Sequence, residues 1–324
     1  MEDSRPTLAQ YFVEQACPDN RFLEKMDSTI PWWEIQEWFD GHIYRNANRT
    51  GRPAYPLMLM FKIHLLQQWY NLSDREAEFQ INDRLSFRKF LGLSIEDNVP
   101  DATTIENFRH LIWEEQDVGK GLMKVLDKYF KQIGLITREG NLIDATFLQA
   151  NSKSHADPNK NSDVDAQYGH KGFGYSGTIN MDKKSKLIRK TVVTGANVLD
   201  FKSMKQALVG DEKVVYGDKG YVPARKQVKK RYPNIELRIM HKRQRGKKGE
   251  LTPELNVFQQ EDNRRYARER ARVEHAFAAI KSVFKFRRLR YRGLERVTAK
   301  FNSLCIAYNF YRLGFLMKNQ GITV

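Results

Sequence analysis

The sequence has almost no cysteine and no long apolar run. Its two cysteines, Cys17 and Cys305, are isolated, so neither a disulfide framework nor a cysteine-rich metal site is indicated. The most apolar stretch, residues 55–66, is interrupted by Lys62 and His64 and is too short to span a bilayer. The first residues include acids where a signal peptide would carry cations. With no internal repeat or low-complexity segment either, the pattern predicts a soluble, cytoplasmic protein without a membrane partner.

What the sequence has in excess is positive charge. The 324 residues carry a formal net charge of +16, and 41% hydrophobic residues are enough for a sizeable core. The excess is concentrated between Arg238 and Arg292, where 17 Lys and Arg stand against 6 Asp and Glu. Such a segment indicates a polyanionic partner, and nucleic acid is favoured over an anionic membrane.

The apolar pattern changes its period near Gly134. Residues 55–133 show helical periodicity, with a capping box predicted from Ser73 to Glu76. The following residues contain three strand-like segments and then helix and strand in alternation, which predicts a mixed sheet with helices on its faces. The expected strands are residues 141–148, 173–181, 187–194, 213–216 and 235–240; the expected helices are 200–208, 223–232, a long one holding Glu274, and 294–316; residues 151–168 are expected to form an exposed loop.

Three acidic residues stand where such a sheet can bring them together. Asp144 lies in the middle of the first strand, a position that disfavours Asp unless it is paired or used. Asp218 follows the fourth strand between two glycines, at the edge where sheets of this kind bind ligands. Glu274 lies on the long helix. Three converging carboxylates repel one another unless a cation neutralises them, and oxygen ligands favour Mg²⁺ or Mn²⁺.

Each acid also has a purely structural interpretation. Asp144 could be a hydrogen-bonded strand residue, and Asp218 could simply form the turn. Arg270 and Glu274 could be a surface pair at i, i+4, which contributes only about 0.2–0.5 kcal/mol. In an uninterrupted α-helix, however, Glu274 lies about 40° and Lys281 about 20° from Arg270, so one acid and two cations share a stripe beside the apolar face. The joint occurrence favours a site.

The three acid motifs resemble those of DDE transposases of bacterial insertion sequences. They read Leu142-Ile-Asp144-Ala-Thr-Phe, Gly217-Asp218-Lys-Gly-Tyr221 and Arg270-x3-Glu274-x6-Lys281. The resemblance covers about residues 50–315 and is closest to the fifth insertion-sequence family, within the larger fourth-family superfamily. It implies an RNase H-like core in which Asp144, Asp218 and Glu274 are both the catalytic residues and the metal ligands.

One position departs from the related glutamate motif. The motif has Tyr three residues before its Arg, where this chain has Ala267. Tyr266 is adjacent but falls nearer the apolar face of the helix, so packing in the core is its favoured role. In the wider superfamily Tyr, Arg and Lys hold the DNA end during a hairpin step. The departure puts that step in question, but not the metal triad.

The resemblance implies a two-metal reaction on DNA. Two Mg²⁺ or Mn²⁺ ions about 3.5–4 Å apart serve phosphodiester cleavage; we expect Asp144 to bridge both, Asp218 to hold one and Glu274 the other. Water would free a 3′-OH at the transposon end, and that 3′-OH would then attack target DNA. Arg270 and Lys281 are expected on phosphate oxygens. Two basic segments are further expected to contact DNA: Lys242, Arg243, Arg245, Lys247 and Lys248, then Arg287, Arg288, Arg290 and Arg292. Each could instead be a solvated surface cation.

We therefore expect an α/β protein with three parts. An all-helical domain over residues 1–133 would read the terminal inverted repeats by a helix in the groove, residues 134–292 would form the RNase H-like core, and a helix in 293–324 would pack on that core. The partners are double-stranded DNA, as inverted repeats and target, and a second copy of the chain, in the bacterial nucleoid. Two alternatives remain: a metal-dependent nuclease or resolvase without strand transfer, and a transposase-derived DNA-binding regulator.

Overall fold

The computed structural model describes residues 20–44, 53–151, 163–243 and 254–320. The chain forms two compact units. The helical unit comprises residues 1–125 and 306–324, and the sheet unit comprises residues 126–305. The division falls inside two helices, α8 (Val118–Gln132) and α13 (Leu294–Gln320). In the described part of the chain, no helix combines the length and the apolar character needed to cross a membrane.

The helical unit has an aromatic core. Phe61 is fully buried and stacks on Trp113 with ring centroids 5.6 Å apart, while Phe39 meets Phe61 edge-on. Local caps fix the helix starts, as at Ser73, whose side chain accepts from the Glu76 backbone N–H as the sequence predicts. The described helices of this unit are α2 (Arg21–Thr29), α3 (Trp32–His42), α4 (Leu57–Tyr70), α5 (Asp74–Asp83), α6 (Leu85–Leu91), α7 (Ala102–Asn107) and a π-helical turn η1 (Phe108–Glu114).

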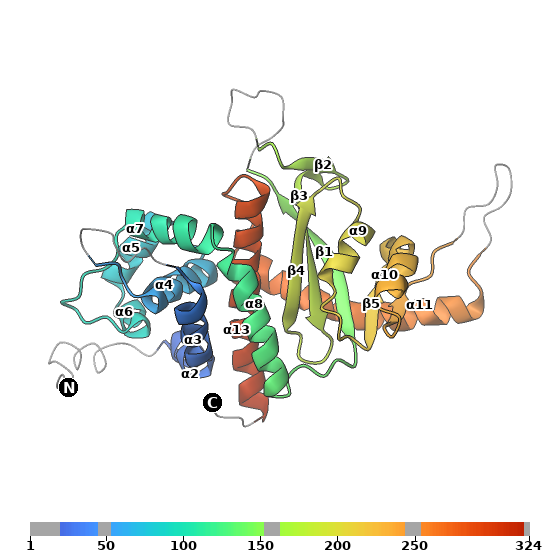
Figure 1. Ribbon diagram of the computed structural model, residues 1–324, viewed down its shortest axis with the longest axis horizontal. Helices are drawn as coiled ribbons and strands as arrows, with labels where there is room; N and C mark the ends of the chain where they lie inside the picture. Colours follow the sequence, from blue (N-terminus) through green and yellow to red (C-terminus); the bar gives the residue numbers. More distant parts are fainter. Residues whose placement is uncertain (1–19, 45–52, 152–162, 244–253, 321–324) are drawn as a thin grey trace. The chain divides into compact units, whose positions relative to one another are not determined.

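The sheet unit is built on a six-stranded mixed sheet, which confirms the expected RNase H-like arrangement (Figure 1). β1 lies at its centre, antiparallel to β3 and parallel to β5, and β6 continues parallel to β5. β4 and β2 both pair with β3 on its other side. The strands are β1 (Asn141–Gln149), β2 (Gln167–Gly169), β3 (Gly172–Asp182), β4 (Ile188–Gly195), β5 (Val214–Gly217) and β6 (Glu236–Ile239).

One face of this sheet is covered by helices α9 (Asp200–Ala207) and α10 (Arg225–Arg231), which lie together (Figure 1). A core cluster on this face joins Ile143 of β1 and Val215 of β5 to Met204 of α9 and Val228 of α10, and all four side chains are fully buried. Burying an aliphatic side chain of this size stabilises the fold by about 1.5–3 kcal/mol. The cluster therefore fixes β1 against β5, the two strands that carry the predicted aspartates.

The other face receives α11 (Val257–Arg270) and the first half of α13. Successive side chains of a strand point to opposite faces, and Tyr216, next to the cluster residue Val215, meets Tyr266 of α11 edge-on at 6.0 Å. Gly177 of β3 lies so close to α13 that a Cβ there would stand 2.8 Å from the Phe301 ring. Tyr266 is 9% exposed, so it packs in the core as the sequence analysis favoured.

Two expectations about secondary structure were incomplete. The segment expected as a loop over residues 151–168 ends in β2, three residues that pair with the start of β3. The long glutamate helix is also interrupted: α11 ends at Arg270, a 3₁₀ turn η3 (Ala271–Val273) and a short α12 (Glu274–Ala278) follow, and a π-helical turn η4 (Ala279–Val283) ends the run. The remaining strands and helices of the sheet unit begin and end within a few residues of the predicted positions.

Candidate active site

Asp144 lies on β1, where the alternation that buries Ile143 turns its side chain toward the face that carries α11. Its carboxylate is 17% exposed and accepts a hydrogen bond from Arg270 Nη2 at 3.2 Å. Burial raises the pKa of Asp144 above its ordinary value, and the neighbouring charge of Asp218 adds to this, although Arg270 acts in the opposite direction. The single contact with Arg270 therefore does not offset the cost of burying the Asp144 carboxylate.

Asp218 stands directly after β5, at the carboxyl end of the strand beside β1. The register pairs Leu142 with Tyr216, so Asp144 and Asp218 extend from the same level of two adjacent parallel strands. Asp218 also caps the 3₁₀ turn η2 (Lys219–Ala224), where its Oδ1 accepts from the Gly220 backbone N–H at 2.7 Å. The turn interpretation and the site interpretation of Asp218 are thus both compatible with the structure.

Glu274 is exposed and begins α12, one 3₁₀ turn after Arg270. The angular positions expected for this helix were wrong, because they assumed uninterrupted α-helix. A residue in a 3₁₀ turn advances the chain by about 120° rather than 100°, so three such residues carry Glu274 roughly 60° further round from Arg270. Lys281 is exposed in the π-helical turn η4, which changes its phase again. The structure places Arg270 on Asp144 without aligning Glu274 or Lys281 with that pair.

Carboxylate oxygens are the donors that Mg²⁺ and Mn²⁺ prefer, and Asp144 and Asp218 provide them side by side. The incomplete compensation of the Asp144 carboxylate by Arg270 is a second feature that suits a divalent cation. Across the described residues, however, no three His, Cys, Asp or Glu side chains are grouped closely enough to hold an ion. The donor set thus fits a divalent ion in chemistry and in its two aspartates, with the third donor turned outward.

Two residues near the aspartates were not predicted as part of the site. Tyr221 is 1% exposed, and its hydroxyl has no hydrogen-bond partner among the described residues. Burial raises its pKa, and the charges of Asp144, Asp200 and Asp218 raise it further. Asp200, the first residue of α9, accepts from Ser176 Oγ at 3.2 Å. The sequence predicts a helix that starts at Asp200. Nothing in that pattern indicates that Asp200 is one of the carboxylates near Tyr221.

A small cavity of about 170 Å³ opens between β1 and the start of α9. It is lined by Ala145, which follows Asp144, by Asp200, and by the exposed His170 and Lys171 of the turn between β2 and β3. Neither Asp144 nor Asp218 is among the residues that line this cavity.

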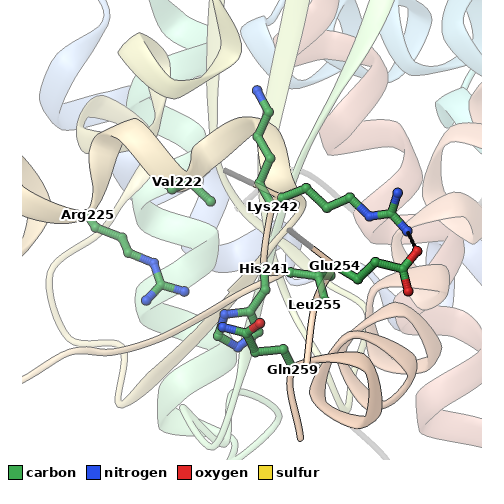
Figure 2. A pocket seen from close by; sticks show the side chains of 8 residues that line it. Val222, Arg225, His241, Lys242, Glu254, Leu255 and Gln259 are labelled. Atoms are coloured by element: carbon green, nitrogen blue, oxygen red, sulfur yellow. Dashed lines mark hydrogen bonds and ion pairs between the residues drawn. The ribbon is translucent and has the colours of Figure 1, made fainter. Parts of the chain in front are cut away.

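The predicted DNA-binding cations lie on two exposed segments of the sheet unit. Lys242 and Arg243 follow β6 and line a larger cavity with His241 (Figure 2). The second segment carries Arg287, Arg288, Arg290 and Arg292 between η4 and α13, and it is fixed because Phe284, Phe286 and Leu289 are buried and Leu289 N–H donates to Gln149 C=O at 3.1 Å. The predicted contacts Arg245, Lys247 and Lys248 lie outside the described residues.

Comparison with known proteins gives two family matches. Residues 11–111 match the model described as Transposase domain (DUF772), and residues 136–310 match the model described as Transposase DDE domain. The second match covers more than half of the chain and includes Asp144, Asp218 and Glu274. The protein belongs to the DDE transposase family and is a DDE transposase of insertion-sequence type. The matches do not distinguish the fifth insertion-sequence family from its relatives, and membership implies dependence on a divalent metal ion.

Two solved structures are similar over most of the chain at low identity. The first is a piggyBac transposase synaptic complex with hairpin DNA, with a TM-score of 0.45 and 13% identity over 94% of this chain and 77% of that chain. The second is a Mos1 transposase paired-end complex with the left transposon end, with a TM-score of 0.27 and 11% identity over 95% and 88% of the two chains.

Proposed function

We propose that this transposase cuts DNA at the terminal inverted repeats of its insertion sequence and joins the freed 3′ ends to target DNA. The observation that carries the proposal is the placement of Asp144 and Asp218 at the same level of two adjacent parallel strands, in a chain matched by the DDE domain model. Both inverted repeats and target are double-stranded DNA, and joining two ends requires at least two copies of the chain.

Asp144, Asp218 and Glu274 are the proposed ligands of two divalent ions, Mg²⁺ or Mn²⁺. When bound, such ions supply a nucleophilic oxygen at neutral pH and stabilise the leaving oxygen. The protein's own contribution is to hold the two aspartates close together on adjacent strands and to place Arg270 beside the phosphate. We propose that the 3₁₀ turn at Ala271–Val273 rewinds into α-helix on DNA binding and turns Glu274 toward Asp144, since a mid-helix 3₁₀ turn often marks a hinge.

The remaining parts are assigned by charge and family match. The residues before about 133, which contain the first matched transposase domain, are proposed to read the inverted repeats. Residues 134–292 form the proposed catalytic core, with the helix that begins at Leu294 packed on it. The exposed Arg287, Arg288 and Arg290 and the half-buried Arg292 are proposed to neutralise backbone phosphates, together with Lys242 and Arg243 and, outside the described residues, Arg245, Lys247 and Lys248.

The decisive test replaces Asp144 by Asn. The probes are labelled duplexes taken from the DNA that flanks the gene, with Mg²⁺ or Mn²⁺ present. We expect strand cleavage to fall at least about a thousandfold, since the ligand set stabilises the transition state by several kcal/mol, while binding of the ends changes little. Asp262→Asn, on a partly exposed position of α11, is the matched control and should cleave normally.

The same assay separates the alternatives. A strand-transfer reaction with pre-cut ends yields joined product if the proposal holds. Cleavage without any joining would replace it by a nuclease or resolvase, and metal-independent binding without cleavage by the wild type would replace it by a DNA-binding regulator. Cleavage retained by Asp144→Asn would remove the catalytic assignment altogether.

A further inference from the structure

The larger cavity of the sheet unit, about 400 Å³, carries a cluster of cations that no family match assigns (Figure 2). Its lining comes from three segments: η2 and the start of α10, the residues after β6, and the start of α11. Arg225, Lys242 and Arg243 contribute positive charge, and Glu254 contributes one negative charge. The cavity therefore attracts an anion.

The cavity lies on the same sheet edge as the aspartates. β1, β5 and β6 run parallel, and the registers pair Leu142 with Tyr216 and Gly217 with Ile239. Residues 144, 218 and 240 are therefore level with one another on three adjacent strands. Neighbouring strands are about 4.8 Å apart, so the cavity, which begins at His241, is roughly 10 Å from the level of Asp144. A DNA strand that crosses this edge reaches the cavity within a few nucleotides of the cut.

The guanidinium of Arg225 is held in place and still has N–H donors that make no hydrogen bond within the described residues. Its Nη2 donates to the Ile239 carbonyl at 2.8 Å, which ties the guanidinium to the end of β6. Its Nε is buried and has no acceptor among the described residues. An arginine carries five N–H donors in a planar fork that matches phosphate oxygens. A fixed guanidinium with unused donors at a cavity wall is suited to bind an anionic oxygen.

The neighbouring backbone is fixed as well. Asn263 of α11 accepts from the His241 N–H at 2.6 Å and donates to the His241 carbonyl at 3.1 Å. Lys242 follows this clamped residue, so its stem starts from a defined position. Gln259, in the first turn of the fourteen-residue helix α11, also lines the cavity, and the positive end of the helix dipole there favours an anion.

We propose that this cavity is a binding site for one backbone phosphate of the DNA strand that is cut, held by Arg225 and Lys242. Glu254, which pairs with Arg243 at 3.2 Å, opposes the phosphate and limits its affinity. The identity of the strand rests on the proposed transposase function. The phosphate chemistry of the cavity does not, because it follows from the fixed cations alone.

The first test compares two arginines of α10. Arg225→Gln and Arg231→Gln remove the same charge from the first and last residue of that helix, but only Arg225 lines the cavity. We expect Arg225→Gln to weaken binding of the flanking-DNA duplex about tenfold, as loss of a charge-assisted hydrogen bond implies, and to lower the slope of log affinity against log salt by about 0.9. Arg231→Gln should change affinity less than about twofold. Equal losses in the two variants would overturn the proposal.

A second pair of variants is expected to change DNA affinity in the opposite direction, and it leaves Arg225 unchanged. Glu254→Gln removes the acid from the cavity, whereas Glu236→Gln removes another exposed acid, which pairs with Arg238 elsewhere. We expect Glu254→Gln to bind DNA about two- to threefold more tightly and Glu236→Gln to bind as the wild type does. Tighter binding by neither variant, or by both equally, counts against the cavity.

The sharpest experiment locates the phosphate. A set of duplexes carries a single uncharged methylphosphonate at successive positions of the cut strand, and each is titrated with wild type and Arg225→Gln. At one position within a few nucleotides of the cut, the loss of affinity caused by the methylphosphonate and the loss caused by Arg225→Gln should not add, because both changes remove the same contact. Additive losses at every position would refute the site. Inorganic phosphate serves as a further arm: if it binds to the wild type at millimolar concentration but not to Arg225→Gln, and the methylphosphonate losses are additive at every position, the cavity binds free phosphate and not a DNA strand.

The outcomes stay separate from those of the Asp144 test. Cleavage retained by Asp144→Asn removes the proposed catalytic role and leaves a coupled phosphate at Arg225 intact. Normal Asp144 behaviour with no coupling at Arg225 removes only the phosphate site.

Discussion

Two clusters in the sheet unit pair arginine with aspartate, but they differ in how completely the aspartate is neutralised. Arg189 of β4 has a fully buried side chain and donates to Asp127 at 2.7 Å and to Asp211 at 2.7 Å, while Lys131 contacts both aspartates. Arg270 has a side chain that is 27% exposed and makes one 3.2 Å contact with Asp144. The first cluster is closed on itself, and the second is open.

The pKa values of the aspartates express the difference. Burial acts to raise the pKa of Asp211, but hydrogen bonds from Lys131 and Arg189 outweigh it and hold the pKa below its ordinary value of 3.8. Burial raises the pKa of Asp144, and Arg270 does not offset it. A structural ion pair satisfies its carboxylate, whereas a site that must bind a further cation leaves its carboxylate under-compensated.

The largest expected effect comes from breaking the closed cluster. Arg189→Met leaves the buried Asp127 with Lys131 as its remaining cation and the partly exposed Asp211 with Lys131 and Arg138. Removing one partner of a buried pair costs about 3–5 kcal/mol. The measurement is amide hydrogen exchange of the protected β3 and β4 amides. All five tryptophans lie between residues 32 and 113, so tryptophan fluorescence follows the helical unit and provides an internal control. A loss of unfolding free energy below about 1 kcal/mol would contradict the contrast between the closed and the open cluster.

A smaller effect is expected from Asp211→Asn, and it depends on pH. The folded pKa of Asp211 lies below the unfolded value of 3.8, so its carboxylate contributes stability above that value, which is lost as the pH falls through the folded pKa. Because Asp211 is 28% exposed, we expect a loss of only about 1 kcal/mol near neutral pH. The difference between wild type and variant should close in acid, as measured by hydrogen exchange or urea unfolding. A difference independent of pH would show that the charge is not responsible.

Arg270→Met sharpens the comparison because it makes the same substitution in the open cluster. The single, partly exposed contact predicts a loss of stability below about 1 kcal/mol, measured in the same way as for Arg189→Met. Strand cleavage by the variant should also fall, because Arg270 is proposed to contact the phosphate. A stability loss as large as that of Arg189→Met would place Arg270 among the structural residues.

The smallest expected change in stability is that of Asp144→Asn in metal-free buffer. The raised pKa shows that the fold disfavours the ionised carboxylate, so a neutral side chain of the same shape relieves that cost while Arg270 loses its partner. We expect the two effects to cancel within about 0.5 kcal/mol. Calorimetry of the variant beside the wild type measures this, and a clear destabilisation would mean that Asp144 is held like Asp127.

Much of this arrangement could be predicted from periodicity and turn chemistry. The β3–β4 hairpin turns at Asp182–Lys186, where Asp182 accepts from the backbone of the turn and Lys186 adopts a positive φ of 63°. Asp144 and Asp218 were found because a central strand disfavours an acid that is neither paired nor used, and because an acid after a strand end lies where such sheets bind ligands. The fold and both aspartates follow from local patterns that tertiary contacts reinforce.

The interruptions of the glutamate helix could not be predicted in the same way. Residues 271–283 contain neither Pro nor Gly, so the choice among 3₁₀, α and π hydrogen bonding is made by packing, which buries Val273 and Ile280. Arg225 was missed for a related reason. It is one of several cations on α10, and only the contact with the Ile239 carbonyl distinguishes it. The roles of Glu274 and Lys281 stay predictions.

The basic segment after η4 has a consequence for the entropy of association. Three apolar side chains, Phe284, Phe286 and Leu289, pin an otherwise irregular stretch, while Arg287, Arg288 and Arg290 remain outside. A chain that is already immobilised loses little freedom when a polyanion docks on it. The positions of its charges are fixed relative to one another, so the spacing between the arginines should affect DNA affinity more than any single arginine does. A one-residue insertion there should therefore lower DNA affinity more than the loss of one arginine.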